Sequence, residues 1–281
     1  MAYNSLDELE KVKKYYIQDR LQKRFSALVT GETNSGKTYL LRTARKPIHI
    51  DSFDPGGTKC LRDLIEKGDV IADTRWESDD PYNPKVFAEW MKATELRFHT
   101  GYFDMFSTYV IDSATTFGEA VMNYGLGNKN RAGEAPQMRH DYMPQKTYMT
   151  NYIKKLMSIP CDFIMTGHLR EIRKLISVDA KTGISREEIK YRFYTTGQAV
   201  VTIPLLFDEI YVLTGVDGPN EPVRKMLVDS LGTYVARSRL KANGLLKSSE
   251  PPDIKALLKK VGFSVVDKPK IVLPKKEDKS D

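Results

Sequence analysis

Short runs of apolar residues, each bounded by polar or turn-forming residues, recur along the chain and predict the strands of a buried sheet. They occupy residues 25–30, 47–51, 70–72, 108–112 and 162–166. Segments with apolar residues at helical spacing lie between them, which indicates a parallel sheet covered on both faces. Two later runs, 206–213 and 223–229, flank a turn-like segment and predict antiparallel strands. We therefore expect an α/β fold with a mainly parallel central sheet, flanked by helices, and antiparallel strands at its C-terminal side.

The first 23 residues predict a lead-in helix. The helix is expected from Ser5 to about Arg20, because Ser5 to Glu8 form a capping-box pattern. Its apolar residues recur at helical spacing: Leu6, Leu9, Val12 and Tyr16. We expect this helix to pack beside the following domain.

Other segments are marked by turn formers and charge. Asn83 and Pro84 predict the start of a helix. Residues 123–145 contain three glycines and two prolines and are predicted to form a long loop. Residues 254–260 predict a short terminal helix, and the Lys/Pro-rich residues 268–281 predict a disordered tail.

The loop after the first predicted strand has the phosphate-loop pattern G-x-x-x-x-G-K-[ST]. Its residues are Gly31, Glu32, Thr33, Asn34, Ser35, Gly36, Lys37 and Thr38. The glycines allow successive N–H groups to turn inward around phosphate oxygens, and a helix then begins at the phosphates. Lys37 supplies a charge for the β- and γ-phosphates, and the Thr38 hydroxyl can bind Mg²⁺. The sequence therefore predicts a site for ATP and Mg²⁺.

Further polar residues end the neighbouring strands. Ligands of parallel sheets bind at the carboxyl ends of strands, where Gly31, Asp51, Asp112 and Thr166 are expected. Asp112 is the expected second magnesium-binding group, the alternative being a solvated strand-end aspartate. His168, two residues after Thr166, is expected to sense the γ-phosphate, the alternative being a histidine that caps its strand.

Composition and charge limit the class of protein and its expected location. The chain of 281 residues has 41 % hydrophobic and 29 % charged residues, as is ordinary for a globular protein, and a net charge of +7 that favours an anionic partner. No run approaches the ~18 apolar residues of a membrane span. Cys60 and Cys161 are widely separated and the four histidines lack zinc-ligand spacing, so we expect a cytoplasmic protein without a metal framework.

The order of these motifs resembles that of phage-encoded RecA-like ATPases, most closely the group linked to single-strand annealing and recombination. The resemblance rests on the phosphate loop, on residues 47–57, 109–113 and 163–168, and on 234–239. It implies a RecA-like P-loop ATPase domain over 24–247, followed by a short helix and basic tail over 248–281. The implied protein binds ATP, forms a ring or filament, and engages single-stranded DNA.

The resemblance also assigns catalytic roles. Asp112 corresponds to the Walker B aspartate and His168 to a polar sensor. RecA has a catalytic glutamate where this chain has Phe53, so Asp54 or Asp51 is left as a candidate to position water. Two more residues, Arg237 and Arg239, lie where basic pairs of RecA-like assemblies reach the ATP site of a neighbouring subunit; the alternative is two solvated arginines.

A basic segment follows His168. Its candidate DNA-binding residues are Arg170, Arg173, Lys174, Arg186, Lys190 and Arg192. Cationic side chains can follow a phosphate backbone, and the nearby Tyr191, Phe193 and Tyr194 can stack on bases. Residues 124–145, with Lys129, Arg131, Arg139 and His140, form a second candidate loop. The alternative is a charged hairpin on a solvated face.

Together these features predict an Mg²⁺-dependent ATPase that engages DNA. The resemblance implies single-stranded DNA in phage recombination or replication, in contact with phage or host proteins of that process. ATP would order the segment after His168, and hydrolysis would release DNA. A nucleotide or polynucleotide kinase, a motor, helicase-loader or packaging ATPase, and a nucleotide-gated assembly protein remain alternatives. The expected location is the cytoplasm of an infected bacterium.

Overall fold

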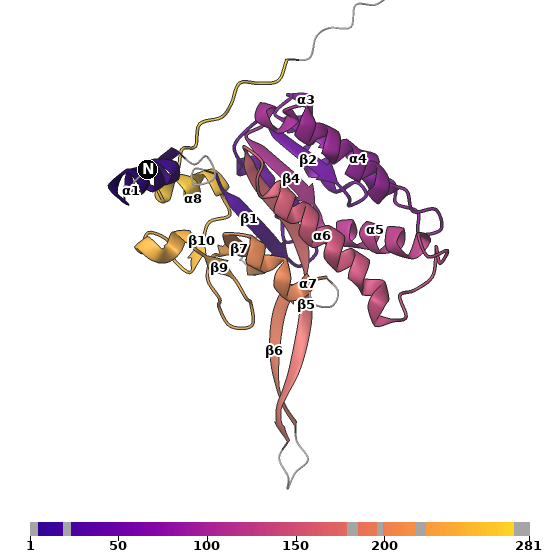
Figure 1. Ribbon diagram of the computed structural model, residues 1–281. Helices are drawn as coiled ribbons and strands as arrows, with labels where there is room; N and C mark the ends of the chain where they lie inside the picture. Colours follow the sequence, from indigo (N-terminus) through magenta and orange to yellow (C-terminus); the bar gives the residue numbers. More distant parts are fainter. Residues whose placement is uncertain (1–4, 19–23, 179–184, 196–198, 217–222, 273–281) are drawn as a thin grey trace, which may run out of the picture.

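A computed structural model describes residues 5–18, 24–178, 185–195, 199–216 and 223–272 (Figure 1). Its described strands form one sheet, in the order β10-β8-β7-β1-β5-β4-β2-β3, with β6 paired to β5 and β9 paired to β7. The strands are β1 (Ser26–Gly31), β2 (Ile48–Ser52), β3 (Val70–Asp73), β4 (Thr108–Asp112), β5 (Asp162–Val178), β6 (Ser185–Phe193), β7 (Glu209–Val216), β8 (Val223–Leu227), β9 (Arg237–Ser238) and β10 (Ser249–Glu250).

The six strands from β7 to β3 are parallel. Antiparallel pairs join β6 to β5, β8 and β9 to β7, and β10 to β8. Strand β5 lies between β1, which leads into the phosphate loop, and β4, which ends at Asp112. One strand therefore separates the phosphate-loop strand from the strand that carries the acid. The predicted fold class, an α/β P-loop fold with a RecA-like strand order, is confirmed.

Helices cover both faces of the sheet, because alternate strand residues bury apolar side chains on opposite sides. The helices are α1 (Ser5–Gln18), α2 (Lys37–Leu40), α3 (Arg62–Glu66), α4 (Val86–His99), α5 (Ala114–Gly127), α6 (Tyr142–Leu156), α7 (Ala199–Thr202) and α8 (Ile254–Lys260). On one face Leu28 packs with residues of α4 to α7. On the other face its neighbours Ala27 and Val29 pack with α2, α3 and α8.

The glycine-rich stretch predicted as one long loop is helical at both ends, and only its middle part, residues 128–138, is irregular. Helix α5 continues to Gly127, and α6 begins at Tyr142. The glycines permit close helix packing: a Cβ on Gly125 would lie 3.1 Å from Pro144 of α6. The turn-forming composition thus reflects a close approach between two helices. Similarly, the helix expected to start at Asn83 and Pro84 begins only at Val86.

The basic segment after His168 forms a long β-hairpin. Strand β5 runs from the centre of the sheet through His168 and continues to Val178, and it pairs with β6 from Leu169 onward. The hairpin projects from the body of the molecule (Figure 1). The described parts of this segment are thus paired strands.

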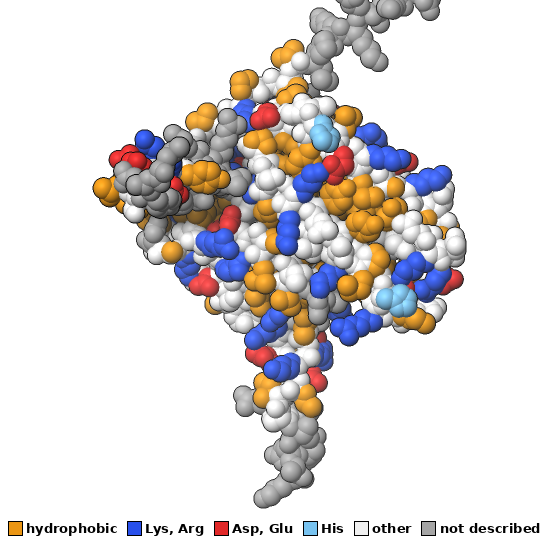
Figure 2. All heavy atoms as spheres, in the orientation of Figure 1, with side chains coloured by type: hydrophobic (Ala, Val, Ile, Leu, Met, Phe, Trp, Pro, Cys, Tyr) orange, Lys and Arg blue, Asp and Glu red, His pale blue; other side chains and the backbone are white. Residues whose placement is uncertain are grey.

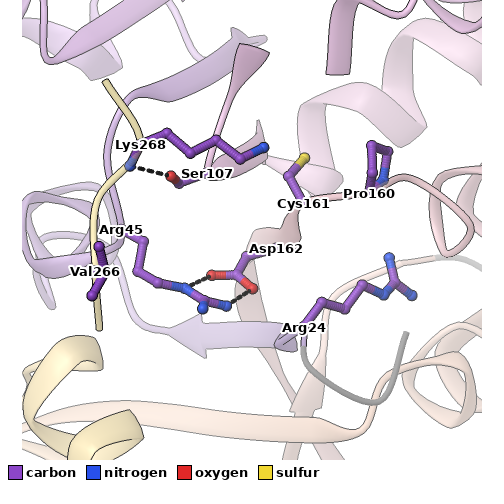
Figure 3. A pocket seen from close by; sticks show the side chains of 8 residues that line it. All are labelled: Arg24, Arg45, Ser107, Pro160, Cys161, Asp162, Val266 and Lys268. Atoms are coloured by element: carbon purple, nitrogen blue, oxygen red, sulfur yellow. Dashed lines mark hydrogen bonds and ion pairs between the residues drawn. The ribbon is translucent and has the colours of Figure 1, made fainter. Parts of the chain in front are cut away.

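The packing of the two ends of the chain differs from what the sequence predicts. Most described side chains of α1 are exposed, including Leu9 at 64 % and Val12 at 58 %. At the other end, β10 pairs with β8 and α8 joins the core, so no structural boundary falls at residue 247. The chain then crosses the amino-terminal edge of the sheet, where the Lys268 N–H donates to Ser107 Oγ beside the Arg45–Asp162 ion pair (Figure 3). Residues 273–281 lie outside the described residues.

Candidate nucleotide-binding site

The phosphate loop joins β1 directly to α2, whose first residue is Lys37. Gly36 has a φ of 93° and Asn34 a φ of 64°, both in the left-handed region that turns the backbone sharply. Gly31 is required by close approach, because a Cβ there would lie 2.9 Å from the Leu213 carbonyl oxygen. The expected phosphate cradle is therefore built from backbone at the carboxyl end of β1.

Lys37 lies inside this loop. Its Nζ donates to the carbonyl oxygens of Gly31 at 3.1 Å and Glu32 at 2.8 Å. Burial lowers the pKa of this ammonium group, whereas the carboxylates of Asp112 and Asp54 oppose the shift. A phosphate oxygen would be a stronger, charged acceptor for the same group.

Asp112 is buried at the end of β4, between two hydroxyl groups. Thr38 Oγ1 donates to Asp112 Oδ2 at 2.7 Å, and Thr166 Oγ1 of β5 donates to the other carboxylate oxygen. Burial raises the pKa of Asp112, although these two hydrogen bonds favour the carboxylate. The carboxylate and the Thr38 hydroxyl are hard oxygen donors of the kind that Mg²⁺ prefers, so this donor set fits the ion.

Asp54 faces the same cavity, which has a volume of about 340 Å³ and is also lined by Lys37, Thr38 and His168. Its Oδ1 accepts hydrogen bonds from Ser113 at 2.9 Å and from Thr116 at 2.5 Å. Its Oδ2 lies 3.9 Å from His168 Nε2. Burial opposes ionisation of Asp54, but the hydrogen bonds outweigh it and the pKa is lowered. Asp54 thus presents a carboxylate to the end of the cavity marked by His168.

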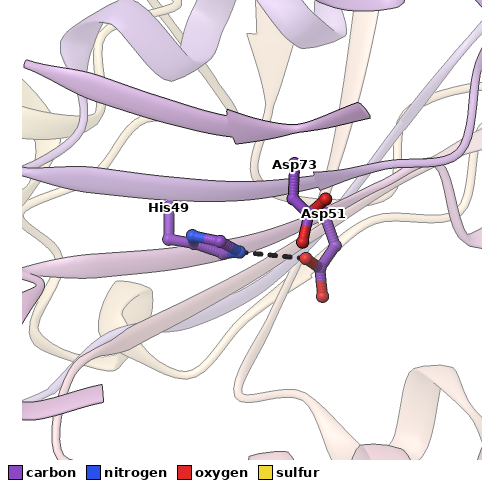
Figure 4. A group of neighbouring side chains, drawn as sticks. All are labelled: His49, Asp51 and Asp73. Carbon is purple, nitrogen blue, oxygen red and sulfur yellow. Dashed lines mark hydrogen bonds and ion pairs between the residues drawn. The ribbon is translucent and has the colours of Figure 1, made fainter. Parts of the chain in front are cut away.

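Neither Phe53 nor Asp51 has access to this cavity. Phe53 is 3 % exposed and packs in the core. Asp51 is fully buried, next to His49 and near Asp73 (Figure 4). Its two oxygens accept hydrogen bonds from five side chains: His49, Trp76, Trp90, Arg97 and Tyr109. The alternative that Asp51 positions water is therefore wrong. Although His49, Asp51 and Asp73 are near enough to hold a metal ion, hydrogen-bond donors already occupy the Asp51 oxygens.

Arg237 and Arg239 lie at the amino-terminal edge of the sheet, away from the phosphate loop of their own chain. Arg237 pairs with Ile210 of β7, and its Nη2 donates to the Phe207 carbonyl at 2.7 Å. The exposed Arg239 forms an ion pair with Asp208 at 2.7 Å. A role at a neighbouring subunit's site stays a prediction.

The register of the hairpin sorts its charges onto two faces. Arg170 lies directly opposite Arg192, and Lys174 and Lys190 follow on the same face, because side chains alternate along each strand. This face also carries one acidic residue, Glu188, which forms an ion pair with Lys190 at 2.9 Å. Arg173 lies on the other face, where it contacts Glu171 and, at 3.8 Å, Glu187. Lys and Arg side chains are seen around the base of the hairpin in Figure 2. Arg186 pairs with Ser177 beyond a register shift, and its side chain is outside the described part.

In the second candidate DNA-binding loop, the charges of two basic side chains are balanced by acidic residues of the same loop. Lys129 and Arg131 both bind Asp141, at 2.9 and 2.8 Å, and Arg131 also binds Glu134. His140 lies 3.6 Å from the same Asp141 carboxylate, and Arg139 is exposed.

Sequence reasoning missed two residues that face the site. Arg224 of β8 lines the nucleotide cavity, although it is far from the phosphate loop in sequence. Glu119 of α5 borders an adjoining cavity with Glu32 and His168, and burial and the charge of Asp54 raise its pKa. The sequence does offer a signal for Glu119, because this acidic residue follows shortly after the strand that ends at Asp112. Arg224 carries no local signal, because only the pairing of β8 with β7 brings it to the loop.

These features define a P-loop NTPase, a class that generally uses ATP with Mg²⁺. Residues 23–214 match the family AAA_24, described as an AAA domain, and the chain belongs to that family. No curated protein sequence matches the chain. A KaiC-like protein from the hyperthermophilic archaeon Pyrococcus horikoshii is similar in structure, with 13 % identity, a TM-score of 0.39, and coverage of 72 % of this chain and 78 % of that one. Within the described ranges, no helix is both long and apolar enough to cross a membrane.

Proposed function

We propose that this protein binds and hydrolyses ATP with Mg²⁺ and engages single-stranded DNA through the β5–β6 hairpin. The observation that carries the proposal is that Lys37, Thr38 and Asp112 lie together at the phosphate loop. Thr38 donates a hydrogen bond to Asp112, and Lys37 and Thr38 line the same cavity. These groups supply the point charge and the oxygen donors that phosphoryl transfer requires.

Each residue has a separate task in hydrolysis. The loop amides and Lys37 hold the phosphates, while Thr38 and Asp112 hold Mg²⁺, which supplies positive charge to the β- and γ-phosphates. Thr166 keeps Asp112 oriented through its hydrogen bond. Asp54 orients the attacking water with Oδ2, since Ser113 and Thr116 already occupy Oδ1. Its lowered pKa keeps it ionised at neutral pH.

The basic face of the hairpin, defined as Arg170, Lys174, Lys190 and Arg192, supports the DNA role. Like charges directly opposite each other destabilise a strand pair, and Arg170 faces Arg192. A bound polyanion would relieve this repulsion. The resemblance to phage-encoded RecA-like ATPases supports single strands as the form of DNA and phage recombination or replication as the process, with phage or host proteins of that process as partners.

Nucleotide binding and DNA binding would be coupled through β5. His168 faces Asp54 in the cavity, and its carbonyl oxygen accepts a hydrogen bond at 2.8 Å from Tyr194 at the end of the hairpin. A change at the γ-phosphate would therefore be transmitted to the base of the hairpin.

Self-association into a ring or filament is the remaining part of the proposal, with Arg239 as the residue that acts in trans. Its ion pair with Asp208 is exposed, and such pairs contribute only about 0–1 kcal/mol, so it is readily released. Turnover per subunit should rise with protein concentration, and Arg239→Ala should remove that rise without changing ATP affinity.

The test is the ATPase rate without nucleic acid, with single-stranded DNA and with duplex DNA. Stimulation by single strands is expected, and Lys37→Ala should abolish both ATP binding and ATP-dependent DNA binding. Lys46→Ala is a matched control, because its ion pair with Asp69 lies outside the cavity. Transfer of the γ-phosphate to a nucleotide or polynucleotide instead of water would favour a kinase. DNA binding that is the same with and without ATP would contradict the coupling.

A further inference from the structure

Arg224 of β8 lies against the phosphate loop. A Cβ built on Gly36 would lie 2.8 Å from Arg224 Nη1 and 3.2 Å from its Cζ, so the guanidinium rests on the loop backbone at the residue before Lys37. Arg224 also lines the cavity with Lys37 and Thr38. None of the ion pairs within the described ranges includes Arg224.

The sheet holds this side chain in place. Strand β7 lies beside β1, with Leu213 opposite Gly31, and β8 pairs with β7, with Arg224 opposite Gly215. Along β8, Met226 shares a face with Arg224 and packs in the core beneath α2. Arg224 therefore projects on the side of the sheet where the phosphate loop and α2 lie.

We propose that Arg224 binds the α- and β-phosphates of the nucleotide from within the same chain, an inference that rests on the proposed nucleotide binding. In a phosphate loop the backbone amides surround the α- and β-phosphates, and Arg224 lies against this part at Gly36. The γ-phosphate end of the cavity is marked by His168 on β5, which lies at the other side of β1, and by Asp54 in the loop after β2. Arginine suits this task because its planar fork can bind two phosphate oxygens.

The neighbouring Lys225 offers a control of the same charge. It pairs with Thr214 and, by strand alternation, projects to the opposite face from Arg224. Both side chains are exposed, so neither Arg224→Ala nor Lys225→Ala removes a core contact. A difference in nucleotide affinity between the two variants would therefore come from the position of the side chain and not from the loss of one positive charge.

The experiment is a titration of the full chain, in Mg²⁺, with N-methylanthraniloyl-labelled ADP and ATP. Arg224→Ala should weaken both nucleotides by about 10-fold or more, Arg224→Lys should recover part of the loss, and Lys225→Ala should stay within about twofold. In turnover assays, Arg224→Ala should raise KM, because the group that binds the α- and β-phosphates is removed.

Several outcomes would overturn this inference. Equal affinities for Arg224→Ala and Lys225→Ala would remove Arg224 from the site, and a loss confined to ATP would place it at the γ-phosphate. Tighter binding by Arg224→Ala would mean that the side chain obstructs the cavity. If Lys37→Ala alone loses nucleotide, the proposed function stands and only this inference fails. If the folded wild-type protein binds neither nucleotide, both fail.

Discussion

The sharpest consequence of the hairpin register concerns the salt dependence of DNA binding. The double variant Arg170→Ala/Arg192→Ala removes the cross-strand pair at the base of the basic face. For single strands, log K falls with log[salt] with a slope of about −0.7 for each phosphate neutralised. If all four cations of the basic face bind phosphates, with Lys190 leaving its ion pair with Glu188, the wild-type slope is about −2.8. The double variant, with two cations left, then has a slope of about −1.4.

These slopes predict a large difference over an accessible range. Between 50 and 200 mM salt, wild-type affinity should fall about 50-fold, and that of the double variant about sevenfold. The assay is fluorescence anisotropy of a labelled oligothymidine with ATP present, across that range. The removal of two facing cations should not destabilise the hairpin, so circular dichroism should be unchanged.

Arg173 provides the matched control, because it lies on the opposite face and is paired with Glu171. Arg173→Ala should keep the wild-type slope. An unchanged slope in the double variant, or an equal loss in Arg173→Ala, would refute the assignment of DNA to the basic face.

The remaining predictions concern two aspartates on or after β2. Asp54→Asn should lower kcat by about 10²–10⁴-fold with ATP affinity largely retained, and single-turnover kinetics would separate the two effects; a wild-type kcat would exclude Asp54 as the group that orients water. Asp51→Asn should lower the free energy of unfolding by about 3–5 kcal/mol in urea titrations, because it removes one of the two carboxylates that pair with the buried Arg97 and leaves only Asp73; a loss below about 1 kcal/mol would contradict this account. Burial opposes ionisation of Asp51, but His49 and Arg97 outweigh it and lower the pKa, so its stabilisation is complete above about pH 4 and is lost as pH falls further. The difference in unfolding free energy between wild type and Asp51→Asn should therefore shrink from pH 7 to pH 3, and a constant difference would refute the pKa assignment.

The sequence by itself determined the parts of the site that depend on local spacing. A phosphate loop needs glycines at fixed positions, a lysine and a hydroxyl within eight residues, and these read directly from Gly31 to Thr38. Asp112 could be predicted because it ends an apolar strand, and the carboxyl ends of parallel strands meet at one edge of a sheet. The alternation of strands and helices was sufficient for the fold class.

Only the tertiary structure decided which nearby polar residues serve the site. Asp51 and Asp54 lie three positions apart, yet one is buried under five hydrogen-bond donors and the other faces the cavity. The register of β5 and β6 placed Arg173 on the opposite face from the other cations, and the pairing of β8 with β7 carried Arg224 to the phosphate loop. Composition and spacing are local, whereas strand register and side-chain burial depend on contacts between residues far apart in the chain, so no motif in the sequence records them.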